Sequence, residues 1–373
     1  MARSGSGVRA VGAARAASLA LGALVLVGAV GAAAAVSTGC AKRKKPAPGS
    51  AGSGSGAHAG GASSVDPVER QAAEQATAAS ASAGAAAFGK AFALHQTACT
   101  GGDWSQCVDL GIDYQEGRGV APDMAQAAAH YKQGCDHGSA SGCTDLGQLY
   151  DRGDGVPRDV AQAATLYKKG CDGGSPLGCN DLGLDYKDGT GVAPDDARAV
   201  RLFTKACDLG NADGCTNLGY MRSNGRGVAQ DAVAASELYR KACEGGSGQG
   251  CHNLAYRYEH GLGVPRSEKD ALPLYEKGCG LAVPGACDNE GNLYERGTEI
   301  PHDFDKAVAL YAKACAMKDA TGCNNVGHMY EQGHGVPQSD AKAAEYYKRA
   351  CDDGLALGCT NLGQLQKAGR AGP

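Results

Sequence analysis

The sequence has few of the bulky aromatic residues that usually build a large hydrophobic core. It contains one Trp and four Phe in 373 residues, against 58 Gly. A core made from Leu, Ala and the 15 Tyr residues must be thin, because small side chains let packed elements approach closely. We therefore expect thin layers of secondary structure and no large closed pocket.

The motifs of the commonest catalytic and metal chemistries are also missing. There is no H-E-x-x-H metalloprotease motif, no G-x-S-x-G nucleophile elbow and no C-x-x-C-H haem motif. One S-x-x-K occurs, from Ser339 to Lys342, without the S-D-N and K-T-G partners that a serine β-lactamase needs. Ser339 stands where Asp159 caps a helix in another repeat, so we interpret it as a cap. The sequence predicts no catalytic residue, no metal and no cofactor.

An excess of positive charge is absent as well. Lys and Arg number 36 against 40 Asp and Glu, a net charge of -4. Residues 1–39 hold three Arg and no acid, which leaves 33 basic and 40 acidic residues, or -7, and without the KRKK run 29 and 40, or -11. An acidic array argues against nucleic acid as a partner.

The dominant feature is a double series of cysteines. Members of each series are 36 residues apart, and the two series are offset by eight, so each pair reads C-x7-C. A period kept through eight copies indicates tandem units stacked as a solenoid. Zinc sites favour C-x2-4-C spacing, so we expect disulfides. The sixteen cysteines are Cys99, Cys107, Cys135, Cys143, Cys171, Cys179, Cys207, Cys215, Cys243, Cys251, Cys279, Cys287, Cys315, Cys323, Cys351 and Cys359.

The N-terminus predicts export. Three Arg precede an apolar run at residues 16–36, which is typical of an export signal. The run ends at Ser37-Thr38-Gly39-Cys40, which resembles a bacterial lipobox, and this predicts that Cys40 is lipidated and tethers the protein to a membrane, in the periplasm or at the cell surface. Cleavage after Ala35, which would give a secreted protein, and retention of the run as an anchor are the alternatives.

Four segments follow from this pattern. Residues 1–39 form the export signal and residues 40–65 a flexible Gly/Ser/Pro tether. Residues 66–87 form an N-terminal helical segment, which a Ser/Ala/Gly stretch weakens before Phe88. Residues 88–373 form the repeat array.

Each unit contains two short helices. Cys143, Leu146, Gly147 and Tyr150 follow i, i+3, i+4, i+7 and share one face of a first helix, which Gly153 ends. Glycine recurs at the position of Gly147 in most units. Because glycine inside a helix costs about 1 kcal/mol against alanine, we expect two helix backbones to approach closely there.

The second helix is capped by Asp159 and buries a face that includes Tyr167 and Cys171. Cys135 falls in the last turn of one second helix and Cys143 in the first turns of the next first helix. A tight turn between them brings their β-carbons within disulfide range. We predict eight bridges: 99-107, 135-143, 171-179, 207-215, 243-251, 279-287, 315-323 and 351-359.

The pattern L-G-x-x-Y-x-x-G-x-G-V-x-x-D-x-x-x-A-x-x-x-Y-x-K-x-C, from Leu146 to Cys171, resembles the Sel-1-like repeat family, a relative of the tetratricopeptide repeats. With C-x7-C in every unit it is most similar to the cysteine-rich secreted Hcp branch. The resemblance covers residues 88–366. It implies an all-α fold, a right-handed α/α solenoid whose first helices line a concave groove, and a role in protein or peptide binding. Some members of that branch are known as penicillin-binding or β-lactamase proteins.

The sequence departs from the pattern in places. Arg222 and Gln366 replace the first-helix Tyr, and Thr298–Ile300 replaces G-x-G-V. Pro273 falls inside a second helix, and we expect that helix to start late, at Asp270.

One polar position recurs on the first helices, two residues after the second cysteine of each pair. A row of such groups could hydrogen-bond the backbone of an extended peptide, or it could bond neighbouring helices and keep the stacking register. Tyr220, Tyr256, Arg257, His260, Asn292 and His328 vary between units, as expected where specificity is set. The recurrent residues, here called the polar series, are Asp109, Asp145, Asp181, Asn217, Asn253, Asn289, Asn325 and Asn361.

From these features we predict an exported, disulfide-stapled scaffold that binds a protein or an extended peptide in the bacterial cell envelope. Two alternatives stay open at this point. One is a β-lactamase-like hydrolase, by family analogy, and the other is a purely structural spacer.

Overall fold

The computed structural model describes residues 67–372, with side chains from residue 84 onward. These residues belong to one compact unit, residues 65–373. The predicted signal, the tether and Cys40 lie outside the described residues. Among the described helices, none combines the length and apolar character needed to cross a membrane.

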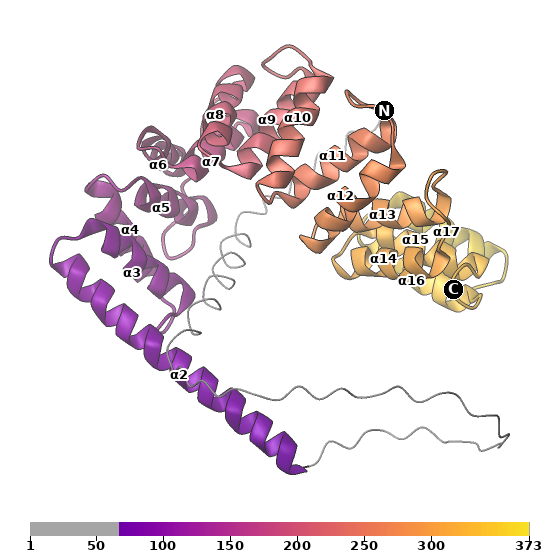
Figure 1. Ribbon diagram of the computed structural model, residues 1–373, viewed down its shortest axis with the longest axis horizontal. Coiled ribbons are helices and arrows are strands. Elements are labelled where there is room, and N and C mark those ends of the chain that lie inside the picture. Colours follow the sequence, from indigo (N-terminus) through magenta and orange to yellow (C-terminus); the bar gives the residue numbers. More distant parts are fainter. Residues whose placement is uncertain (1–66, 373) are drawn as a thin grey trace, which may run out of the picture. The chain divides into compact units, whose positions relative to one another are not determined.

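All regular structure in residues 67–372 is α-helical (Figure 1). The sixteen helices of this part are α2 (Pro67–Thr100), α3 (Trp104–Glu116), α4 (Met124–Asp136), α5 (Ala140–Arg152), α6 (Val160–Asp172), α7 (Pro176–Asp188), α8 (Asp196–Asp208), α9 (Ala212–Asn224), α10 (Ala232–Glu244), α11 (Gly248–His260), α12 (Glu268–Gly280), α13 (Pro284–Arg296), α14 (Phe304–Ala316), α15 (Ala320–Gln332), α16 (Asp340–Asp352) and α17 (Ala356–Lys367).

The helices stack in pairs along the chain, with odd-numbered first helices and even-numbered second helices. Each first helix from α5 onward also contacts the first helix of the next unit, as α9 contacts α11 and α11 contacts α13. No comparable contact joins successive second helices of the described array. The first helices therefore form a continuous layer, and the predicted solenoid is confirmed.

Helix α2 runs unbroken through the Ser/Ala/Gly stretch that we expected to weaken it. Its last part, residues 88–100, takes the place of a second helix before α3. The turn glycine Gly119 lies against the carbonyl of Phe88, as Gly155 lies against that of Met124 at the start of α4. Both glycines have positive φ, +73° and +69°, and a Cβ at either would meet backbone atoms.

The eight predicted disulfides are all present. Each bridge joins cysteines eight residues apart, with Cα atoms 4.4 to 4.7 Å apart. Cys135 ends α4 and Cys143 starts α5, so each bridge ties a second helix to the following first helix. The loop-entropy model assigns about 2 to 3 kcal/mol of stabilisation to each bridge.

The recurrent first-helix glycine has a different cause from the one we expected. A Cβ at Gly147 would lie 2.8 Å from the ring of Tyr167, and one at Gly111 would lie 2.6 Å from the ring of Tyr131. The close approach is therefore that of a second-helix aromatic ring to the first-helix backbone, and not chiefly that of two backbones. Gly363 has nothing within 4 Å, and the described residues hold no second-helix ring packed against it.

Two local departures support each other. Helix α12 begins at Glu268 with Pro273 inside it, so the predicted late start at Asp270 is wrong. The buried Glu268 carboxylate accepts hydrogen bonds from the backbone N–H groups of Thr298 (2.7 Å) and Glu299 (2.8 Å). The altered loop of the next unit thus holds the first turn of α12, and exposed Pro273 costs the helix one backbone hydrogen bond.

Candidate functional site

The polar series is engaged mainly in contacts between units. Three of its asparagines each donate a side-chain hydrogen bond to the residue 37 positions earlier, on the preceding first helix. These bonds have the structural role that we considered as the alternative to peptide binding, namely keeping neighbouring helices in register. The three bonds are Asn217 to Asn180 (2.8 Å), Asn325 to Asp288 (2.8 Å) and Asn361 to Asn324 (2.9 Å).

The other members of the series also have partners inside the chain. Buried Asp181 accepts a 3.1 Å hydrogen bond from Gln148 of the preceding unit, and Asp145 is buried as well. Asp109 and Asn253 each bond a glutamine of their own helix, and Asn289 donates to the Tyr275 hydroxyl at 3.3 Å. Binding of a peptide backbone by the polar series therefore stays a prediction.

The position five residues after the second cysteine is more accessible. Tyr220 of α9 and Tyr256 of α11 occupy it in successive units, and both are 43% exposed. Their neighbours at this position are only partly buried, and they differ from unit to unit. The eight residues are Ile112, Gln148, Leu184, Tyr220, Tyr256, Asn292, His328 and Gln364.

Arg257, which we grouped with the variable surface residues, is buried instead. Its guanidinium donates to the Ser236 hydroxyl (2.7 Å), the Ser223 hydroxyl (2.9 Å) and the Ala232 carbonyl (3.0 Å). Burial lowers the pKa of this guanidinium below its usual range. Arg257 therefore holds α11 to α9 and α10, and it does not face a partner.

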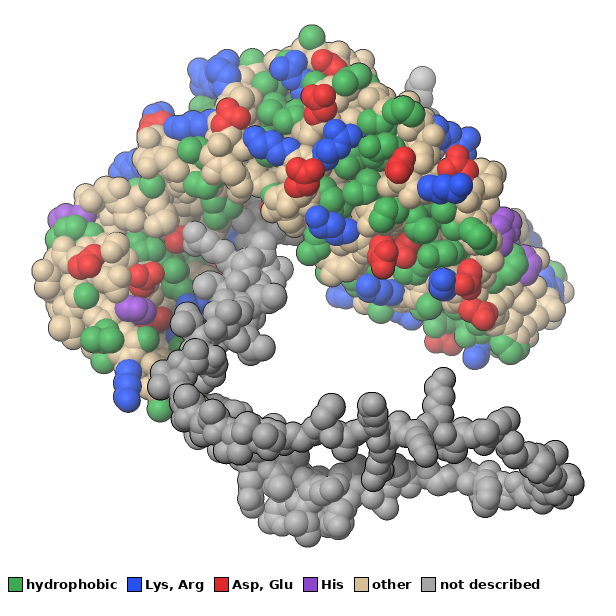
Figure 2. Space-filling model, viewed as in Figure 1, with side chains coloured by type: hydrophobic (Ala, Val, Ile, Leu, Met, Phe, Trp, Pro, Cys, Tyr) green, Lys and Arg blue, Asp and Glu red, His purple; other side chains and the backbone are tan. Residues whose placement is uncertain are grey.

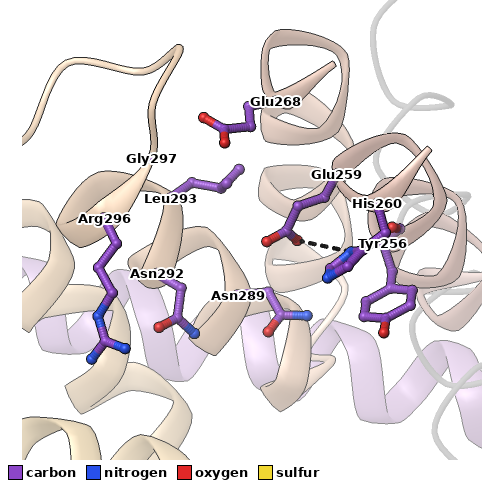
Figure 3. Close-up of a pocket in the computed structure, with 9 residues that line it drawn as sticks. All are labelled: Tyr256, Glu259, His260, Glu268, Asn289, Asn292, Leu293, Arg296 and Gly297. Carbon is purple, nitrogen blue, oxygen red and sulfur yellow. Dashed lines mark hydrogen bonds and ion pairs between the residues drawn. The ribbon is translucent and has the colours of Figure 1, made fainter. Parts of the chain in front are cut away.

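A hollow of about 330 Å³ lies between the first helices α11 and α13 (Figure 3). Glu259 and His260 stand on its α11 side, and Asn292 and Arg296 stand on its α13 side. The Tyr256 ring stacks on His260, with centroids 4.0 Å apart. The full lining is Tyr256, Glu259, His260, Glu268, Asn289, Asn292, Leu293, Arg296 and Gly297.

Glu259 belongs to a repeated pair that sequence reasoning missed. The Tyr275 hydroxyl donates to Glu259 at 2.5 Å, and the same bond, sixteen residues apart, joins Tyr311 to Glu295 (2.6 Å) and Tyr347 to Glu331 (2.7 Å). Burial, and then the neighbouring carboxylate, raises the pKa of each of these tyrosines. The repeated Tyr and the acid sixteen residues before it were the available signal.

The surroundings of the three carboxylates differ. Arg296 lies 3.0 Å from Glu295, and Arg370 lies 3.0 Å from Glu331. Among the described residues, no Lys or Arg lies within ion-pair distance of the Glu259 carboxylate. Its Oε2 lies 4.0 Å from Nδ1 of His260, and Arg266 donates to the Glu259 backbone carbonyl at 3.1 Å. Glu259 is 23% exposed and faces the hollow.

Helix α13 carries three buried carboxyl groups, Asp288, Glu290 and Glu295. Burial, and then the charge of Asp319, raises the pKa of Asp288 to about 6. Burial, and then the charge of Glu276, raises the pKa of Glu290 to about 7. Glu290 occupies the core position that Leu146 fills in another unit, so its carboxyl has lost most of its water.

The S-x-x-K residues cap a helix, as predicted. The Ser339 hydroxyl accepts a hydrogen bond from the Lys342 backbone N–H at 3.3 Å, at the start of α16. The Lys342 ammonium lies 4.9 Å from the ring centre of Tyr330 and not against the serine. Within residues 67–372 no group of three or more His, Cys, Asp or Glu side chains could hold a metal ion.

Charge is mixed over the surface. Figure 2 shows acidic and basic side chains interspersed on the face in view, with apolar side chains between them. A surface of this kind does not select a polyanion by its field alone.

Comparison with known proteins places these features in a family context. The model of the Sel1 repeat matches seven segments: residues 107–139, 140–175, 176–211, 212–247, 248–282, 286–319 and 320–355. No curated protein matches the chain.

Several solved structures are similar. A protective antigen of uropathogenic Escherichia coli with an SLR fold is 29% identical, with a TM-score of 0.60, over 73% of this chain and 58% of the antigen. This chain thus matches little more than half of the antigen's length. A Sel1 repeat protein from Oxalobacter formigenes is 28% identical, with a TM-score of 0.58, over 74% of this chain and 79% of that protein. Cysteine-rich protein B of Helicobacter pylori is 32% identical over 35% of this chain and 93% of its own, with a TM-score of 0.30.

Proposed function

This chain belongs to the Sel1 repeat family, and on that premise we propose that it is an exported scaffold that binds an extended segment of another protein along its first helices. One observation carries the proposal. Tyr220 and Tyr256 are exposed at equivalent positions of neighbouring first helices, whereas second-helix tyrosines such as Tyr275 are buried. Exposed tyrosines in a row suit a protein partner, because they bury a large area with few rotatable bonds.

Different positions of the first helices have different roles, and this supports the choice of surface. The polar series and the Cys/Leu/Gly face are used in stacking, and so vary little between units. The position five residues after the second cysteine is free to vary, which is where a repeat protein sets specificity. The polar series lies beside this position, and because a carboxylate or amide oxygen can accept more than one hydrogen bond, it could add hydrogen bonds to a bound backbone.

The cysteines support export. The array has sixteen of them in eight bridges, and such bridges persist only in an oxidising compartment. We propose that the protein works in the periplasm or at the cell surface, tethered through a lipid on Cys40. Mass spectrometry of the mature N-terminus tests the tether, and an unmodified Cys40 would remove it.

The test of binding uses the full chain as bait in crosslinking to its own cell-envelope fraction. The informative variant is Tyr220→Ser with Tyr256→Ser. The control is Val233→Ser, which removes an even more exposed apolar side chain (56%) from the second helix α10. The proposal expects a discrete partner that the double variant loses and the control keeps. Equal capture by all three chains would contradict the surface, and no specific partner at all would favour a structural spacer.

A further inference from the structure

The hollow between α11 and α13 contains an acid, Glu259, whose glutamate equivalents in the next two units each lie against an arginine. Arg296, next along the same helix, lies against Glu295, and Arg370, from the loop after α17, lies against Glu331. Glu259 makes the same bond to its tyrosine but has no Lys or Arg partner among the described residues. In two other units of this chain, an arginine guanidinium therefore completes the same Tyr–Glu pair.

The space beside Glu259 is of the right size and lining for such a group. The hollow measures about 330 Å³, and its other acid is already satisfied, because Glu268 bonds the Thr298–Glu299 backbone and Arg266. The cation in its lining, Arg296, is committed to Glu295. The Glu259 carboxylate is thus the acid of the hollow that has no Lys or Arg partner among the described residues. Tyr256 beside it is 43% exposed, with His260 stacked on one face of its ring, and guanidinium groups stack on aromatic faces of this kind.

We propose that this hollow is the anchor site of the binding surface and that it takes an arginine side chain of an extended partner segment. The guanidinium donates to the Glu259 carboxylate and stacks on the face of Tyr256 that His260 leaves free, while Asn289 and Asn292 line the α13 side of the hollow. Arginine fits better than lysine, because its planar fork can bond the carboxylate and stack on the ring together. This inference rests on the proposed function, since it supplies the anchor for that same surface.

The test selects peptides from a random-peptide phage library on the immobilised full chain and measures their affinities by fluorescence polarisation. The variant is Glu259→Gln, whose amide oxygen still accepts from the Tyr275 hydroxyl, so that only the charge is lost. The matched control is Glu331→Gln, at the same repeat position and with the same tyrosine bond, outside the hollow. Tyr256→Ala tests the stacking face.

The proposal expects arginine to recur in the selected peptides. It expects Glu259→Gln to weaken their binding about tenfold and Glu331→Gln to leave it within about twofold, since a charge-assisted hydrogen bond is lost only in the former. Replacement of the arginine in the peptide should cost at least as much as Glu259→Gln, because it also removes the stacking on Tyr256. Once the arginine is replaced, Glu259→Gln should weaken binding no further. Tyr256→Ala should also weaken binding several-fold.

The contrary results separate the two proposals. Peptides that bind equally well to wild type and Glu259→Gln, but lose affinity on Tyr220→Ser, would overturn the arginine anchor and leave the proposed function standing. A library that yields no binder would overturn both. Displacement of the peptide by an equal concentration of free arginine would show that the hollow binds a small molecule. It would overturn the proposal that the arginine belongs to a partner segment.

Discussion

Asn325 donates a 2.8 Å hydrogen bond to the Asp288 carboxylate on the first helix of the preceding unit. Asp288 is buried, so this amide supplies hydrogen bonding that water would otherwise provide. The same exchange between neighbouring units recurs at Asn217 and Asn361. Some polar side chains of the first helices therefore maintain the register of the stack. Those side chains are already engaged within the array, which narrows the set of residues that can contact a partner.

Asn325→Ala should lower the free energy of unfolding by about 1 to 3 kcal/mol, because it leaves buried Asp288 without one of its donors. Asn253→Ala is the control, since Asn253 bonds only a glutamine of its own helix at an exposed site. Urea denaturation followed by circular dichroism measures both. Equal losses in the two variants would show that the bond between units has no special weight.

Gly147→Ala should destabilise the array by about 2 kcal/mol or more, because its Cβ would lie 2.8 Å from the Tyr167 ring in a packed core. Gly363→Ala should instead be neutral or stabilise the protein by up to about 1 kcal/mol, since nothing lies within 4 Å and alanine favours a helix. Thermal unfolding of the two variants gives the comparison. A harmless Gly147→Ala would contradict the close ring contact.

The stability of the unit around α13 should fall as the pH rises from about 4 to about 7. The folded-state pKa values of Asp288 and Glu290 are raised to about 6 and about 7, above the values near 4 of unfolded chains. The folded state therefore binds these protons more tightly than the unfolded state does. The stability that this contributes is complete below the unfolded pKa and is lost as the pH rises through the folded pKa.

Glu290→Leu should remove about half of this pH dependence, because Asp288 keeps its own raised pKa. Leucine is tolerated there because it occupies the same core position in other units. The substitution should also raise the free energy of unfolding at pH 8, on the order of 2 kcal/mol. Melting temperatures between pH 5 and 8 for wild type and variant test this. A wild-type melting temperature that rises with pH over this range would contradict the burial of Glu290.

The sequence predicted the array well because its strongest signals are periodic. The spacing of Cys135 and Cys143 was enough to pair them, and the 3.6-residue pattern around Leu146 and Tyr167 was enough to orient both helices. The capping role of Ser339 also followed from its repeat position. Such features depend only on one unit and its neighbour, and the same pattern recurs in eight copies, so each copy supports the interpretation of the others.

The site was harder to predict because it depends on what differs between units. Arg257 looked like a surface residue by position, and only the packing of Ser223 and Ser236 against it shows that it is buried. The bond between Tyr275 and Glu259 crosses between two helices. That no described arginine lies against the Glu259 carboxylate is visible only once Arg296 and Arg370 are placed. Similarly, the sequence did not show that α12 keeps its full length despite Pro273, because the hydrogen bonds from the next loop to Glu268 are visible only in the structure.

The account as a whole requires a stapled array outside the cytoplasm, and the cysteines of the native protein test this most directly. The protein is isolated from cell envelopes, denatured in the presence of an alkylating reagent, and examined by mass spectrometry before and after reduction. The account predicts that all sixteen array cysteines, Cys99 to Cys359, escape alkylation until reductant is added. Free thiols at many of these positions in the unreduced protein would contradict it.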